Sequence, residues 1–153
     1  MDENLERKIV DAYFVEKYAE IALLMLFLKE EKRRELRNLA AKLVLESKEH
    51  ENSMREILRK MHLSDYSNKR PDFKYTRESI EKNDFNELLL TLVKNEILAM
   101  NNYLEIYLKA DRNEIARYFE DPEKEFYSVL MEMVFEELDH AKRIIKLIEK
   151  IRE

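Results

Sequence analysis

The chain of 153 residues contains no glycine, and this absence limits the folds open to it more than any other feature. A β-sheet protein of this length needs glycine in its hairpin turns, whereas helices joined by polar loops do not. Only two prolines, Pro71 and Pro122, interrupt the sequence. Hydrophobic residues make up 45% of it and charged residues 40%, as in long helices with solvated outer faces. The composition therefore predicts an all-α protein.

The apolar periodicity predicts four long helices, at about residues 3–29, 32–62, 84–110 and 122–151. The connection between the first two is tight, which makes them antiparallel neighbours. The helix pairs 3–62 and 84–151 are separated by residues 63–83, which are rich in turn signals and include a short predicted helix at 76–82. We therefore expect one domain, residues 1–153, folded as an antiparallel four-helix bundle with one long crossover between helices 2 and 3.

Three acidic residues fall where a helix face should be apolar. Read in steps of three and four residues, the apolar stripes are interrupted at Glu16, Glu96 and Glu137. His140 follows Glu137 on the same helical face, and His50 lies on the inner face of the second helix. Ionised carboxylates are almost never fully buried unless they are paired or bind a metal. These five residues therefore predict a buried metal site.

The two halves of the chain resemble each other. Glu16 in the first half matches Glu96 in the second. The gapless alignment pairs residues 43–61 with 133–151, Glu46 with Glu136, and His50 with His140. The second half has about ten extra residues near 110–124, a number that fits a loop or a helix extension. The repeat predicts two similar helix pairs that contribute equivalent residues to one site.

This combination resembles the ferritin-like diiron superfamily, and within it the rubrerythrin branch. The resemblance covers nearly the whole chain. It rests on Glu16-x-x-Ala19, Glu96-x-x-Ala99-x-x-x-Tyr103, Glu49-His50 and Glu137-x-x-His140. It implies a bundle in which one Glu from each of two helices and a Glu-x-x-His pair from each of the others point inward. It also implies that Tyr103 forms a hydrogen bond beside the metal ligands, although a tyrosine on an apolar stripe also suits a plain core position.

One position departs from the family pattern. The resemblance implies a glutamate at position 47, but this chain has Ser47, which cannot supply an anionic bridge. Glu46 lies four residues before His50 on roughly the same helical face, and we expect it to take over that role. The predicted ligands are Glu16, Glu46, His50, Glu96, Glu137 and His140, with Tyr103 and Ser47 beside them. Three outcomes stay open: two metal ions in an altered geometry, one strong and one weak position, or a single metal ion.

The resemblance implies an oxidoreductase with two iron ions, or manganese, that reduces peroxide or dioxygen or oxidises ferrous iron. The oxygen-rich set of ligands favours these metals over zinc. The chain has no cysteine for a rubredoxin-type iron centre, so electrons must come from a separate donor protein or from ferrous iron itself. The alternative is a non-catalytic bundle that binds or stores metal.

Charge and hydropathy narrow the range of partners. The net charge of −5 gives no electrostatic reason to expect nucleic acid. The longest apolar run, 21–28, is far shorter than the roughly 20 residues that span a bilayer, and no signal peptide is visible. We therefore expect a cytoplasmic protein without membrane contact. The heavily charged outer faces favour a homodimer over a many-subunit cage.

Overall fold

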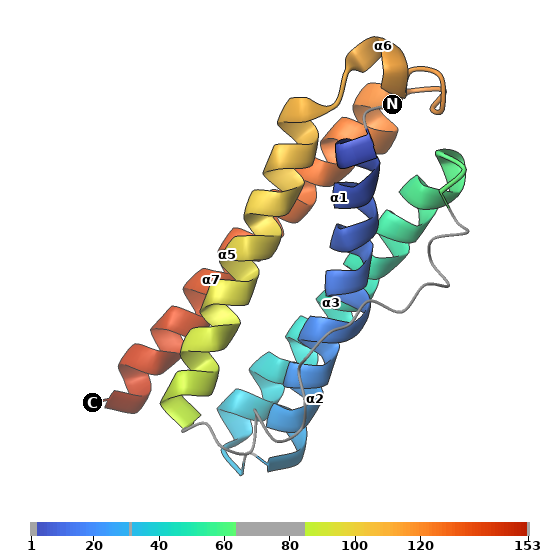
Figure 1. The fold of residues 1–153 in the computed structure, drawn as a ribbon. Coiled ribbons are helices and arrows are strands. Elements are labelled where there is room, and N and C mark those ends of the chain that lie inside the picture. The colour runs from blue at the N-terminus through green and yellow to red at the C-terminus, as the bar shows by residue number, and fades with distance from the viewer. Residues whose placement is uncertain (1–2, 31, 64–84, 153) are drawn as a thin grey trace.

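The computed structural model describes residues 3–30, 32–63 and 85–152. These residues form four long helical segments packed as a bundle (Figure 1), which confirms the all-α prediction. The first segment has three parts: α1 (Glu3–Phe14), a π-helical turn η1 (Val15–Glu20) and α2 (Ile21–Glu30). The other three segments are α3 (Arg34–Lys60), α5 (Phe85–Lys109) and α7 (Ser128–Arg152). The predicted helix boundaries agree with these to within a few residues.

The connection between α5 and α7 accounts for the extra residues of the second half. It contains a short helix α6 (Arg112–Ile115) and a π-helical turn η3 (Glu123–Tyr127) that leads directly into α7. Asp111 caps α6, because its side chain accepts a hydrogen bond of 2.9 Å from the backbone N–H of Glu114. The insertion predicted near 110–124 is therefore a structured connection at one end of the bundle.

The helices form two antiparallel pairs. The segment α1–η1–α2 packs against α3, and α5 packs against α7 (Figure 1). The two pairs meet through contacts between α1 and α5 and between α3 and α7. Figure 1 shows that α3 ends at the opposite end of the bundle from the start of α5. The predicted crossover and the short helix predicted at 76–82 fall almost entirely in residues 64–84, outside the described part of the chain.

The apolar core consists of two clusters, one toward each end of the bundle. Burial of each large apolar side chain stabilises the fold by about 1.5–3 kcal/mol, so these clusters hold the helices together. The first cluster includes Leu5, Ile9, Tyr13, Met54, Ile57, Leu58, Tyr103, Ile106, Phe126, Leu130 and Met133. The second includes Leu23, Leu24, Phe27, Leu36, Leu43, Leu89, Leu92, Ile144 and Ile148.

Between the two clusters, each of the four long segments contributes buried polar residues at the same height. We call this set the polar layer: Glu16, Glu20, Ser47, His50, Glu96, Glu137 and His140. All seven residues are at most 2% exposed. Buried acids of this kind need a proton, a cation or several hydrogen bonds to offset the cost of leaving water. The layer is therefore where the chain can hold a charged ligand.

Candidate metal centre

The π-helical turn η1 brings two acids into the polar layer. Both Glu16 and Glu20 belong to it, and both are fully buried. In a continuous α-helix, the stripe that contains Glu16 continues at Ala19, as the sequence analysis assumed. A π turn inserts one extra residue into the helix, and within and after η1 both Glu20 and Leu24 are buried. The structure therefore adds Glu20, which was not among the predicted site residues.

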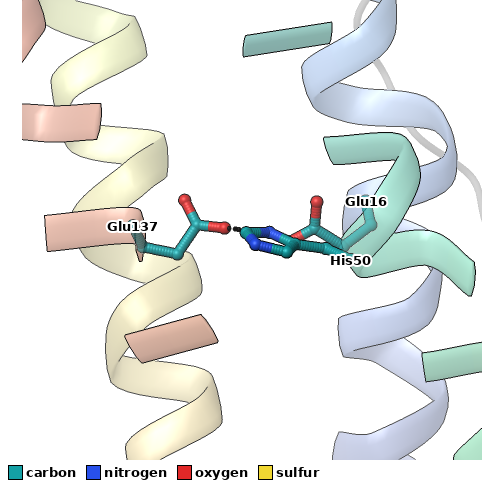
Figure 2. Close-up of side chains that lie close together, drawn as sticks. All are labelled: Glu16, His50 and Glu137. Carbon is teal, nitrogen blue, oxygen red and sulfur yellow. Dashed lines mark ion pairs between the residues drawn. The ribbon is translucent and has the colours of Figure 1, made fainter. Parts of the chain in front are cut away.

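Glu16, His50 and Glu137 form the first group of the layer, which we call the His50 group (Figure 2). Their ligand atoms all lie within 4.8 Å of one another. His50 Nδ1 lies 2.8 Å from Glu137 Oε1 and 3.9 Å from Glu16 Oε1. Figure 2 shows the imidazole ring directed toward the Glu137 carboxylate, which comes from the opposite helix pair. The three residues thus converge on one point from three helical segments.

Glu96, Glu137 and His140 form the second group, which we call the His140 group. His140 Nδ1 lies 3.0 Å from Glu96 Oε2 and 3.4 Å from Glu137 Oε2. The two groups overlap because Glu137 belongs to both, with one carboxylate oxygen near each histidine. The two imidazole rings lie nearly parallel, with their centroids 5.9 Å apart. Two overlapping buried groups of this kind could hold two metal ions.

The outer nitrogen of each histidine faces a carboxylate from the other half of the chain. His50 Nε2 makes a hydrogen bond of 2.6 Å with Glu136 Oε2. His140 Nε2 lies 2.9 Å from Glu46 Oε2, and Glu46 also pairs with Lys42 and Arg143. A carboxylate in this position holds the proton on Nε2 and leaves Nδ1 free to bind a metal. Glu46 therefore lies on the far side of the His140 ring from the two groups.

Tyr103 and Ser47 each donate a hydrogen bond to an acid of the layer. The Tyr103 hydroxyl donates to Glu16 Oε1, and both side chains are buried. The Ser47 hydroxyl donates to Glu20 Oε2 at 2.7 Å. Each bond joins different helical segments and fixes one oxygen of an acid that has few other partners. The second oxygens, Glu16 Oε2 and Glu20 Oε1, have no hydrogen-bond partner among the described residues.

The electrostatics of the layer favour a cation. Burial raises the pKa of Glu16 and Glu96 well above the usual range, and neighbouring carboxylates raise it further. Burial likewise raises the pKa of Glu20 to about 7. The contacts with His140 and His50 outweigh burial at Glu137 and hold its pKa well below the usual range, yet neither of its oxygens has a hydrogen bond of good geometry. Buried carboxylate oxygens without hydrogen-bond partners are a donor set that a divalent metal ion could bind.

The stability of the metal-free protein is expected to fall as the pH rises. Glu20, with its pKa raised from 4.5 to about 7, and His140, with its pKa raised from 6.5 to about 10, both hold their protons longer in the folded chain. Stability is therefore lost from pH 4.5 to about 7 through Glu20 and from 6.5 to about 10 through His140. The lowered pKa of Glu137 acts in the opposite direction, but only at pH values below its ordinary pKa of 4.5.

Metal binding displaces these protons, so it should stabilise the fold more at higher pH. The measurement is thermal unfolding of metal-free and Mn²⁺-loaded protein between about pH 5 and about pH 8, in which the difference in Tm should widen. Metal-free Glu20→Gln serves as the control for the titration, because loss of the titrating carboxyl should flatten the lower part of the metal-free curve. A difference in Tm that stays constant over this range would contradict the expectation.

Comparison of the chain with models of protein families, with curated proteins and with solved structures found no significant match. No described helix is long and apolar enough to cross a membrane. The geometry by itself therefore establishes an all-helical bundle with buried carboxylate and histidine groups that suit a metal site. Of the predicted ligands, Glu16, His50, Glu96, Glu137 and His140 come together in the two groups, and Glu46 lies beside them against His140.

Proposed function

We propose that the protein is a non-haem diiron protein of the ferritin-like, rubrerythrin type that reduces peroxide or dioxygen or oxidises ferrous iron. The observation that carries this proposal is the pair of buried groups that share Glu137, neither of whose carboxylate oxygens has a hydrogen-bond partner among the described residues. Hard oxygen donors with one imidazole for each metal favour iron, with manganese as the second choice. Five of the residues on which the resemblance rests also meet in the polar layer: Glu16, His50, Glu96, Glu137 and His140.

In this proposal, each group holds one metal ion. Glu16 and the Nδ1 atom of His50 bind at one position, and Glu96 and the Nδ1 atom of His140 bind at the other. Glu137 bridges the two positions, since each of its oxygens faces one group. This set of five ligands supplies three negative charges and two neutral imidazoles.

Three further residues support the ligands. Glu136 and Glu46 hold the rings of His50 and His140 through the outer nitrogens, at 2.6 Å and 2.9 Å. The position of Glu46 favours this supporting role over the predicted role as a ligand. Tyr103 fixes Glu16 through Oε1, the oxygen that lies 3.9 Å from His50 Nδ1.

A redox-active metal pair, when bound, supplies electrons to peroxide or dioxygen or takes them from ferrous iron. The chain contributes a closed site, because apolar clusters on both sides keep water away from the layer. The Tyr103 hydroxyl, held against Glu16, places a proton donor at the edge of the His50 group. The electrons would come from a separate donor protein or from ferrous iron, because the chain has no cysteine to hold an iron–sulfur centre.

The second candidate function is a metal-binding or storage bundle without turnover. The burial of the polar layer favours it, since all seven residues are at most 2% exposed and a structural metal needs no route for a substrate. Both candidates require metal at the same residues. They differ in whether the bound metal reacts.

Loading with ferrous iron under anaerobic conditions is expected to give about two metal ions per chain, because the two groups share one carboxylate and have one imidazole each. Metal analysis after removal of free iron measures this number, and retention of no metal would refute the proposed function. An optical spectrum taken before and after addition of peroxide separates the two candidates. Oxidation that ferrous iron or a reductant reverses supports the oxidoreductase, whereas an unchanged spectrum supports the non-catalytic bundle.

A further inference from the structure

Ser47 and Glu20 form a buried pair in the polar layer that the proposed ligand set does not use. Glu20 is fully buried and Ser47 is 1% exposed. The Ser47 hydroxyl donates to Glu20 Oε2 at 2.7 Å, which joins α3 to η1. The other oxygen, Glu20 Oε1, is buried and has no hydrogen-bond partner among the described residues. Metal-binding carboxylates commonly have one oxygen fixed by a hydrogen bond and the other available to the metal, and Glu20 has this arrangement.

Glu20 lies among the acids of both groups. Its negative charge raises the pKa of Glu16 in the His50 group and of Glu96 in the His140 group. Its own carboxylate interacts with Glu137, the residue that the groups share. These charge effects couple Glu20 to acids of both groups, although Glu20 itself belongs to neither group. Its position comes from the hydrogen bond to Ser47, which places the Glu20 carboxylate beside position 47 of α3.

The internal repeat explains why a carboxylate is needed at this point. In the alignment that pairs His50 with His140, Ser47 takes the place of Glu137. A symmetric centre would have one bridging carboxylate from α3 and one from α7, but α3 has only a hydroxyl there. The π turn that carries Glu20 is confined to the first half, because the corresponding part of α5 is α-helical. The π turn and Ser47 are therefore both departures from the internal repeat. A hydrogen bond from Ser47 to Glu20 joins them.

The charge balance between the carboxylates and two divalent metal ions also favours Glu20 as a ligand. Without Glu20, three carboxylates face two divalent cations, which leaves excess positive charge in a buried site where such charge is costly. With Glu20, four carboxylates balance two divalent cations. A serine hydroxyl gives Glu20 only one neutral hydrogen bond, which does not offset the burial of an ionised carboxylate. A metal ion shared between Glu20 and Glu137 does offset the cost of burying that charge.

We propose that Glu20 is the second bridging carboxylate of the metal centre and that Ser47 is the residue that positions it, so that the ligand expected at position 47 of α3 is supplied by η1 instead. This inference rests on the proposed function, because it assumes that the polar layer binds metal. It concerns which residues bind and leaves open which reaction follows.

The test exchanges the two residues. In Glu20→Gln the bridge loses its charge, and the number of tightly bound metals should fall from about two to one or none. In the double variant Glu20→Ser with Ser47→Glu, the carboxylate returns to α3, and binding of about two metals should be restored. Ser47→Ala should keep the number of metals and weaken binding by about tenfold, because Glu20 loses the hydrogen bond from Ser47 that positions it. Anaerobic titration with Co²⁺, followed by its visible absorption, measures number and affinity together.

Glu51→Gln is the matched control. Glu51 is a buried acid of α3 that pairs with Lys48 and Arg55, outside the two groups, so its loss should leave metal binding unchanged. Wild-type protein that binds no Co²⁺ would overturn the proposed function, and this inference with it. Wild-type protein that binds two while Glu20→Gln binds two equally well would overturn the inference alone. If Glu20→Gln does not fold, the exchange variant decides: two bound metals support the inference, and fewer overturn it.

Discussion

Replacement of Glu137 by glutamine is expected to remove both metal ions at once, with affinity reduced by more than about 100-fold at each position. Glu137 is the one residue common to both groups in the described part of the chain. Its Oε1 lies 2.8 Å from His50 Nδ1 and its Oε2 lies 3.4 Å from His140 Nδ1. Glutamine keeps the shape of the side chain but removes the negative charge that both positions share.

Glu16 and Glu96 each belong to only one of the two groups, so their variants provide the comparison for Glu137→Gln. Glu16→Gln and Glu96→Gln should each weaken one position and leave the other, whereas His140→Ala should affect the His140 group first. Metal analysis and Co²⁺ titration give the number bound, and far-UV circular dichroism should show unchanged helix content, because the apolar clusters are intact. Two tightly bound metals in Glu137→Gln would place the metal site elsewhere in the molecule.

The outer carboxylates should control affinity without changing the number of metals. Glu136→Gln and Glu46→Gln are each expected to weaken binding by about 10–100-fold at one position, because each removes the partner that orients one histidine ring. Glu136→Gln should act on the His50 group and Glu46→Gln on the His140 group, as their contacts indicate. Stepwise Co²⁺ titration resolves the two positions if their affinities differ.

Glu132→Gln is the control for these variants, because Glu132 is an exposed acid on α7 one turn before Glu136. It should leave both positions unchanged. Complete loss of one metal in Glu46→Gln, rather than weaker binding at full number, would make Glu46 a ligand, as the sequence analysis expected. The two roles of Glu46 are therefore distinguished by stoichiometry rather than by affinity.

The helices were predictable from the sequence because their signals are local. The absence of glycine and the apolar period alone locate four long helices to within a few residues. The acids at Glu16, Glu96 and Glu137 were found because each one interrupts an apolar stripe. Burial of a carboxylate is costly enough that such an interruption carries information about a ligand.

Glu20 was missed because only one of the two helical stripes that pass through Glu16 was followed. The predicted stripe stepped three residues from Glu16 to Ala19, whereas the structure buries Glu20, four residues on and within η1. The sequence did contain a signal, since the steps Glu16, Glu20, Leu24 and Phe27 also form a stripe that continues into apolar core. Two stripes that diverge at an acid are a sign of such a turn.

The contacts of the outer carboxylates could not be read from either helix alone. Glu136 and Glu46 are equivalent in the repeat, but each one meets the histidine of the other half. Periodicity gives the face of a helix on which a residue lies, and it does not give the residue across the interface. Only the packing of α3 against α7 shows that the partners are exchanged and that Glu46 reaches the outer nitrogen of His140.

The division of the apolar core into two clusters has a consequence for how such a protein evolves. The clusters hold the helices from both ends, and the polar layer adds little apolar contact of its own. Substitutions in the layer therefore change the chemistry of the centre without removing the contacts that define the bundle. A carboxylate can be lost from one helix and regained on its neighbour, as the serine at position 47 and the acid at position 20 suggest, while the scaffold is inherited unchanged.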